Sequence, residues 1–186
     1  ISRTADGKLR GDNTDGPGLV NDLLQNLGWP INDSKILVIG AGGAVRGVLA
    51  SLLAEAPSML HVTNRTHVKA QELEKNFAGT TAVAIDRLQE SYDLVINGTS
   101  AGLSHQDLEI SGSVITGNTR CYDMIYGSGT TRFNQWCQKQ AECDVADGLG
   151  MLVEQAVLAF MIWFGGQVNT APDTRSVINM IRNNLD

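Results

Sequence analysis

The chain has 186 residues, of which 42% are hydrophobic and 18% are charged, and 20 of them are glycine. This profile is typical of a soluble globular α/β protein that is large enough to bury a substantial core. The net charge of −6 disfavours a nucleic-acid surface, because phosphate binding requires a basic footprint.

The three cysteines form no C-x-x-C pair, which indicates free thiols rather than a disulfide framework or a zinc site. We therefore expect no metal site. No signal peptide opens the chain, and its longest apolar run, residues 156–166, is too short to span a bilayer. These features predict a cytoplasmic protein. The chain begins at Ile1 within a polar turn, from which we expect it to be a segment of a longer protein.

The amino-terminal region predicts a hairpin followed by a helix. Residues 1–10 read as a short hairpin with its turn at Asp6 and Gly7, and a glycine-rich loop follows at 11–18. A helix is expected next, because one apolar face is formed by Leu19, Leu23, Leu24 and Leu27. Gly28 is expected to end this helix.

From residue 35 the pattern changes to strands that alternate with helices. Residues 35–40 form a continuous apolar run, as expected of a strand buried on both faces of a parallel sheet. Further strands are predicted at 59–63, 81–85, 92–98 and 120–125, and helices at 45–54, 67–77 and 131–140. The alternation predicts an α/β fold with a doubly wound parallel sheet.

After residue 150 the alternation ends, and two helices are expected at 151–164 and 176–185. The first is apolar almost all round, interrupted by Glu154 and Gln155. A helix of this kind requires burial on several sides.

The turn after the first strand has the composition of a phosphate-binding loop. Gly40 permits a tight turn, Gly42 lets the backbone approach a pyrophosphate, and the helix that follows offers unpaired N–H groups. Val45 stands where G-x-G-x-x-G has its third glycine, and an ordinary glycine-rich turn is the alternative. The position directly after a buried strand favours a dinucleotide site. The expected contacts come from Gly40, Ala41, Gly42, Gly43 and Ala44.

The end of the second strand distinguishes between cofactors. An NAD site usually carries a carboxylate there, whereas this chain has Asn64, Arg65 and Thr66, followed by Lys69. A guanidinium can bind a 2′-phosphate that a carboxylate would repel. NADP is therefore the expected cofactor, the alternative being that Arg65 and Lys69 are simply solvated.

Motifs along the whole chain resemble those of the shikimate dehydrogenase family in order and spacing. The loop GDNTDG at 11–16 is similar to the family's G-x-N-T-D motif, and NGTSAG at 97–102 to its N-x-T-S-x-G loop. The other matching motifs are the phosphate loop at 40–44, the 2′-phosphate clamp at 64–66, DMIY at 123–126 and DGLGMLVEQA at 147–156.

The resemblance implies reversible oxidation of shikimate to 3-dehydroshikimate with NADP, a step in aromatic amino-acid (chorismate) biosynthesis. In that family a Lys–Asp pair handles the hydroxyl proton, and Asp15 matches the aspartate, which also contacts the substrate. Tyr126 and Gln155 match further substrate-contacting positions. Met124 and Gly148 match residues beside the nicotinamide.

The family's amino-terminal half carries a Ser-x-Ser motif and the catalytic lysine, and neither is present here. Lys8, which is near Asp15, does not match that lysine. The resemblance therefore implies an NADP-binding Rossmann domain at 1–148 and, at 149–186, helices that pack on a substrate domain. By itself the chain is expected to be inactive and either to self-associate as a homodimer through residues 151–164 or to shift this helix onto its own domain.

Other interpretations of these residues stay open at the level of sequence. Asp15 could cap a helix that starts near Pro17, Tyr126 could pack at the sheet rim, and Gln155 could be a satisfied core amide. A quinate/shikimate dehydrogenase paralogue is the nearest rival enzyme. The rival of another class is a non-catalytic sensor that binds a nucleotide or a shikimate-pathway ligand.

Overall fold

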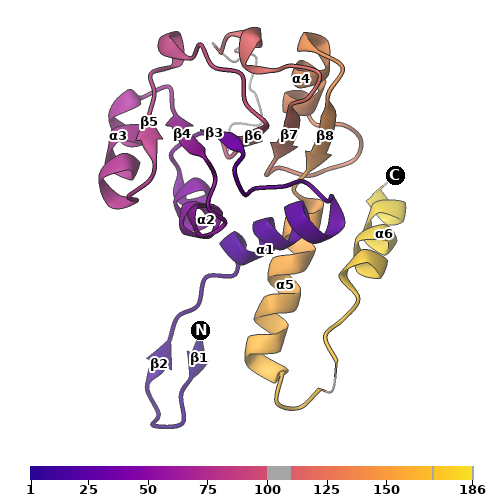
Figure 1. The fold of residues 1–186 in the computed structure, drawn as a ribbon. Helices are drawn as coiled ribbons and strands as arrows, with labels where there is room; N and C mark the ends of the chain where they lie inside the picture. Colours follow the sequence, from indigo (N-terminus) through magenta and orange to yellow (C-terminus); the bar gives the residue numbers. More distant parts are fainter. Residues whose placement is uncertain (100–109, 169, 186) are drawn as a thin grey trace.

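A six-stranded parallel sheet forms the centre of the computed structural model, which describes residues 1–99, 110–168 and 170–185 (Figure 1). The strand order is β5-β4-β3-β6-β7-β8, and every neighbouring pair is parallel. The strands are β3 (Lys35–Ile39), β4 (Met59–Thr63), β5 (Thr81–Ala82), β6 (Leu94–Asn97), β7 (Arg120–Asp123) and β8 (Asp144–Asp147). The predicted doubly wound α/β fold is confirmed.

Helices cover both faces of the sheet (Figure 1). On one face α2 (Gly43–Ala54) and α3 (His67–Asn76) pack on Ile36 and Val38 of β3. On the other face α4 (Arg132–Gln140) and the 3-10 turns η2 (Ile85–Arg87) and η3 (Gly112–Val114) adjoin a second apolar cluster that includes Leu37 and Ile39. The alternate residues of β3 are thus buried on opposite faces, which explains its continuous apolar run.

The topology reverses direction beside β3. The chain passes from β3 to β4 and β5, then crosses back to place β6 on the other side of β3 and continues to β7 and β8. In open α/β sheets, ligands bind outside the carboxyl ends of the strands at such a switch point. Here that position is the end of β3 and β6.

The first helix, α1 (Asp15–Asn21), lies between α2 and α5 (Leu149–Phe164). It approaches both closely because Gly16 and Gly18 have no side chains. A Cβ at Gly16 would collide with Ser51 Oγ of α2, and one at Gly18 would lie 2.8 Å from Cβ of Gln155 in α5. The π-helical turn η1 (Asp22–Asn26) continues α1, and Gly28 follows it with a φ of 67°.

A buried polar cluster connects η1 to β7 and α5. The Asp22 carboxylate, only 3% exposed, accepts hydrogen bonds from Tyr122 Oη at 2.7 Å and Asn26 Nδ2 at 2.9 Å. Asn26 also donates to Glu154 Oε1 at 3.0 Å. Burial raises the pKa of Asp22, the charge of Glu154 adds to the rise, and the two donors oppose it.

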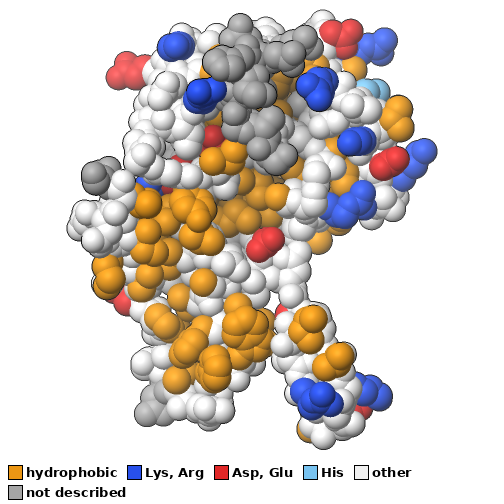
Figure 2. Space-filling view, turned by 180° about the vertical axis from the view of Figure 1, so that it is seen from behind, with side chains coloured by type: hydrophobic (Ala, Val, Ile, Leu, Met, Phe, Trp, Pro, Cys, Tyr) orange, Lys and Arg blue, Asp and Glu red, His pale blue; other side chains and the backbone are white. Residues whose placement is uncertain are grey.

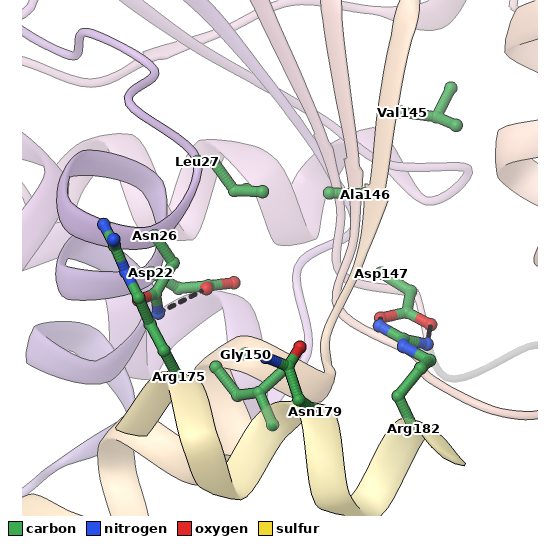
Figure 3. A pocket seen from close by; sticks show the side chains of 11 residues that line it. Asp22, Asn26, Leu27, Val145, Ala146, Asp147, Gly150, Arg175, Asn179 and Arg182 are labelled. Carbon is green, nitrogen blue, oxygen red and sulfur yellow. Dashed lines mark hydrogen bonds and ion pairs between the residues drawn. The ribbon is translucent and has the colours of Figure 1, made fainter. Parts of the chain in front are cut away.

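The last helix, α6 (Thr174–Leu185), packs beside α5 and next to the edge strand β8 (Figure 1). The Arg182 guanidinium binds the Asp147 carboxylate through two hydrogen bonds of 2.6 and 2.7 Å. Figure 3 shows this pair on one side of a cavity of about 480 Å³, with Asp22 and Arg175 on the other.

The hairpin of β1 (Ser2–Arg3) and β2 (Leu9–Arg10) extends away from the sheet (Figure 1). The strands are antiparallel, and Gly7 has a φ of 83°, as the predicted Asp6–Gly7 turn requires. Within the described residues, no helix is long and apolar enough to cross a membrane.

The structure differs from the sequence-based prediction in several elements. The strand expected at 81–85 has only Thr81–Ala82 in the sheet, because the chain turns into η2 beyond it. The edge strand β8 was not predicted at all. The first helix begins at Asp15, one turn before Leu19.

Candidate functional site

The glycine turn lies at the switch point and is open on its outer side. Gly40 has a φ of 113°, and a Cβ there would lie 3.1 Å from the carbonyl carbon of Gly98. Gly42 precedes the first residue of α2, and no side chain within the described part of the chain caps this helix end. Among the same residues, nothing lies within 4 Å of a Cβ built at Gly42 or Gly43. The first N–H groups of α2 therefore stand at an accessible helix end, which attracts anions.

Close backbone contacts join this turn to the ends of β6, β7 and β8. A Cβ at Gly98 would collide with Val45 Cγ2 and lie 3.0 Å from Met124 Sδ. A Cβ at Gly148 would collide with the carbonyl oxygen of Met124 and lie 2.7 Å from its carbon. Val45 replaces the third glycine of the motif, and the space for its side chain is provided by Gly98. Met124 and Gly148, both expected beside a nicotinamide, are therefore neighbours.

Arg65 and Lys69 follow β4, at the carboxyl edge of the sheet and on the other side of β3 from β6. Asn64 Nδ2 donates to the carbonyl oxygen of Thr66 at 2.9 Å, which closes the turn before α3. Arg65, Thr66 and Lys69 are exposed. Among the described residues, no carboxylate forms an ion pair with Arg65 or Lys69. Both cations are thus accessible to an anionic ligand.

The loop before α1 places Asp15 beside α2. The Asp15 N–H donates to Asn13 Oδ1 at 2.9 Å, and Asn13 Nδ2 donates to the carbonyl oxygen of Gly47 at 2.9 Å. A Cβ on Gly47 would lie 3.9 Å from Asp15 Oδ2. The Asp15 carboxylate is exposed and makes no capping hydrogen bond, because α1 begins at Asp15 itself with Thr14 as its N-cap residue.

Gln155 is held next to this loop. Thr14 Oγ1 donates to Gln155 Oε1 at 3.2 Å, and Gln155 Nε2 donates to the carbonyl oxygen of Leu152 at 3.0 Å. Tyr126 follows β7 at the carboxyl edge of the sheet and is 44% exposed. The structure thus brings Asp15 and Gln155 to one region, without placing Tyr126 in hydrogen-bond contact with either. Lys8 is paired with Asp6 at 2.8 Å rather than with Asp15.

Two polar residues that begin the motifs at 97–102 and 123–126, but to which the sequence analysis assigned no role, lie at the centre of this edge. Asn97 ends β6 and Asp123 ends β7, and they are 1% and 2% exposed. The available signal was a polar residue that closes each of two buried strands. Residues 100–102 of the predicted loop motif lie outside the described residues.

The fold and the glycine turn define a doubly wound α/β protein of the Rossmann type. Two family models match the chain: "Shikimate / quinate 5-dehydrogenase" at residues 22–107 and "Shikimate 5'-dehydrogenase C-terminal domain" at 148–177. The chain belongs to the shikimate dehydrogenase family.

Individual relatives agree with this assignment. The chain is 47% identical over 184 residues to a shikimate dehydrogenase (NADP(+)) of Laribacter hongkongensis, covering 97% of this chain and 66% of the relative. It is 48% identical over 169 residues to that of Alkalilimnicola ehrlichii, covering 89% of this chain and 63% of the relative. The chain therefore spans 63–66% of the length of these relatives.

Solved structures show the same similarity. An Ael1 enzyme from Pseudomonas putida superposes with a TM-score of 0.85 at 39% identity, covering 94% of this chain and 64% of that one. Shikimate 5-dehydrogenase from Thermus thermophilus, solved in complex with NADP(H) and shikimate, superposes with a TM-score of 0.80 at 31% identity. That match covers 97% of this chain and 66% of the other.

Proposed function

We propose that this chain is the NADP-binding portion of a shikimate dehydrogenase, an oxidoreductase that reversibly reduces 3-dehydroshikimate to shikimate. The observation that carries the proposal is the open glycine turn at the switch point, with the accessible Arg65 at the end of the neighbouring strand β4. The names of the relatives from Laribacter and Alkalilimnicola support both the cofactor and the reaction. The corresponding role is aromatic amino-acid biosynthesis.

In this proposal the cofactor lies across the carboxyl edge of the sheet. The backbone from Gly40 to Ala44 and the amino end of α2 bind the pyrophosphate through N–H groups and the helix dipole. Arg65 binds the 2′-phosphate, assisted by Lys69 and by the turn that Asn64 and Thr66 form. When bound, NADP(H) carries the hydride of the reaction.

The nicotinamide and the substrate occupy the other half of the edge. Met124 and Gly148 adjoin the nicotinamide, and they pack so closely that a side chain at position 148 would collide with the Met124 carbonyl oxygen. Asp15 takes the hydroxyl proton, and Tyr126 and Gln155 contact the substrate. Gln155 is suited to this role because Thr14, the residue before Asp15, is its hydrogen-bond partner.

The proposal divides the chain into a cofactor domain at 1–148 and helices at 149–186 that complete a substrate domain. It includes a cytoplasmic location, which suits the free thiols of Cys121, Cys137 and Cys143. The substrate pocket is completed by a part of the protein that corresponds to the remaining third of the relatives.

The proposed function is tested by joining the chain to the missing portion of the substrate domain. We expect the chain, joined to the amino-terminal third of one of its relatives, to form NADPH from NADP⁺ and shikimate, followed by absorbance. The 186-residue chain alone should form no NADPH, because it contains no match to the catalytic lysine that pairs with the aspartate in this family. Quinate and NAD⁺ serve as comparison substrates. Binding of NADPH without any turnover in the joined protein would favour a sensor instead.

The end of α5 supports a further proposal about assembly. Ile162, Trp163 and Phe164 are 41, 54 and 44% exposed, although the start of the helix is buried against α1. Figure 2 shows hydrophobic side chains gathered on this lower part of the molecule. A large apolar side chain left in water forfeits about 1.5–3 kcal/mol of burial. We expect the 186-residue chain to form a homodimer through this surface.

Light scattering tests this expectation. The chain should have the mass of a dimer, and Trp163→Glu should shift it to a monomer, because a charge cannot be buried there without a partner. Met180→Glu is the matched control, since Met180 is 64% exposed on α6. A monomeric unmodified chain would contradict the proposal.

A further inference from the structure

Asn97 and Asp123 form a buried pair between adjacent strand ends. They are register partners at the last positions of β6 and β7. Asn97 Nδ2 donates to Asp123 Oδ1 at 2.9 Å, with both residues at most 2% exposed. Burying a carboxylate costs free energy of folding unless hydrogen-bond donors surround it. The presence of a buried Asn–Asp pair at these strand ends therefore needs a structural or functional explanation.

Each member of the pair also holds the loop that follows its own strand. Asn97 Oδ1 accepts hydrogen bonds from the Thr99 hydroxyl at 2.8 Å and the Thr99 N–H at 3.2 Å. Asp123 Oδ1 accepts from the Ile125 N–H at 3.2 Å, and the nearby Thr131 side chain lowers the pKa of the same carboxylate. Burial raises the pKa of Asp123, and these donors oppose the rise. The two loops are thus connected through one hydrogen bond.

The pair is in direct contact with Met124, one of the residues proposed to lie beside the nicotinamide. The Met124 N–H donates to the carbonyl oxygen of Asn97 at 2.9 Å, and Gly98 packs against Met124 Sδ and Val45. Arg65, by contrast, follows β4 on the opposite side of β3. In doubly wound folds each half of the sheet binds one half of the dinucleotide. If Arg65 binds the adenosine 2′-phosphate, the nicotinamide half lies over β6 and β7.

We propose that Asn97 and Asp123 are a positioning pair that fixes the ends of β6 and β7 as the support for the nicotinamide half of NADP(H). This inference rests on the proposed function. The pair does not touch the cofactor. It acts through Gly98, Thr99 and Met124, whose backbone and side chains it holds at a fixed spacing.

The chemistry of the pair permits a reciprocal exchange. Asn97→Asp alone places two carboxylates where a 2.9 Å hydrogen bond stood. Asp123→Asn alone removes the negative charge that strengthens the hydrogen bonds from Asn97 and Ile125, both of which Asp123 Oδ1 accepts. In the double variant, an aspartate at 97 accepts from Thr99 and from the new amide at 123. The NH2 group of that amide then takes the place of Asp123 Oδ1, so the Ile125 N–H loses the acceptor that it has in the unmodified chain.

Titration calorimetry of the 186-residue chain with two ligands tests the pair. The ligands are NADPH and adenosine 2′,5′-bisphosphate, which carries the 2′-phosphate but has no nicotinamide. We expect each single variant to bind NADPH roughly ten- to a hundredfold more weakly, as for a lost charge-assisted hydrogen bond, and to bind the bisphosphate unchanged. The double variant should recover part of the NADPH affinity, because it restores the hydrogen bond between positions 97 and 123 but not the one from Ile125.

Asp93→Asn is the matched control, because the Asp93 carboxylate accepts from the Lys35 N–H at 2.8 Å at the opposite edge of the sheet. It should leave both affinities unchanged. Unaltered NADPH affinity in the single variants would overturn the inference, as would equal loss of both ligands, which would indicate general damage. If the single variants do not fold, the double variant tests the inference instead. A double variant that binds the bisphosphate but not NADPH would overturn the proposed role of the pair. An unmodified chain that binds neither ligand would refute the proposed function itself.

Discussion

Asp15→Asn is expected to lower the kcat for shikimate oxidation by about 10²–10⁴-fold, the usual contribution of a positioned acid–base group. The Asp15 carboxylate is exposed, it has no hydrogen-bond partner among the described residues, and its backbone N–H is fixed by Asn13. Asparagine keeps the size of the side chain but cannot accept a proton. The loop and α1 should therefore be unchanged while the chemistry is lost.

The measurement uses the chain joined to the amino-terminal third of a relative, with NADPH formation followed by absorbance. NADPH affinity should be the same in Asp15→Asn and in the unmodified protein, because Asp15 is not part of the proposed cofactor contacts. Asp12→Asn is the control in the same loop, since the Asp12 carboxylate pairs with Arg10 at 2.8 Å. If Asp15→Asn retained as much activity as this control, Asp15 would not be the proton-transfer residue.

The sheet was predictable because each of its central strands is marked in the local sequence. β3 is buried on both faces, so all of its residues except Lys35 are apolar and the run is unmistakable. β8 was missed because its four residues begin and end with aspartate and it lies at the edge of the sheet. The Asp147 side chain is nonetheless buried, because Arg182 of α6 pairs with it. That partner is 35 residues away, and no local pattern shows it.

The glycines of the site were only partly interpretable. Gly40 and Gly42 belong to the phosphate-binding motif, and the spacing of that motif predicts what each of them does. Gly98 and Gly148 owe theirs to contacts with Val45 and Met124, which come from other elements. Such contacts depend on which strands become neighbours, and that order is a property of the whole topology.

The same reason explains why Asn97 and Asp123 were not predicted as a pair. Each occurs in a recognisable motif, but the hydrogen bond between them exists only because β6 and β7 are adjacent and in register. The relation between Thr14 and Gln155, 141 residues apart, likewise follows from the packing of α1 on α5. The hydrogen bonds between these residues therefore could not be predicted from the sequence.

Selectivity for NADP(H) should depend most on Arg65, and its substitution by alanine is expected to weaken NADPH binding by roughly ten- to a hundredfold. The guanidinium is exposed at the end of β4 and no described carboxylate neutralises it, so its charge is available to a 2′-phosphate. NADH has a hydroxyl in place of the 2′-phosphate, so its affinity should be almost unchanged by Arg65→Ala. Lys75→Ala, at the far end of α3, is the control for loss of a positive charge.

The most direct measurement is calorimetric titration of the unmodified chain and Arg65→Ala with both NADPH and NADH. The unmodified chain should bind NADPH more tightly than NADH, Arg65→Ala should lose most of that preference, and Lys75→Ala should keep it. Equal affinity of the unmodified chain for the two cofactors, or a preference that survives in Arg65→Ala, would contradict the assignment of this edge as an NADP site.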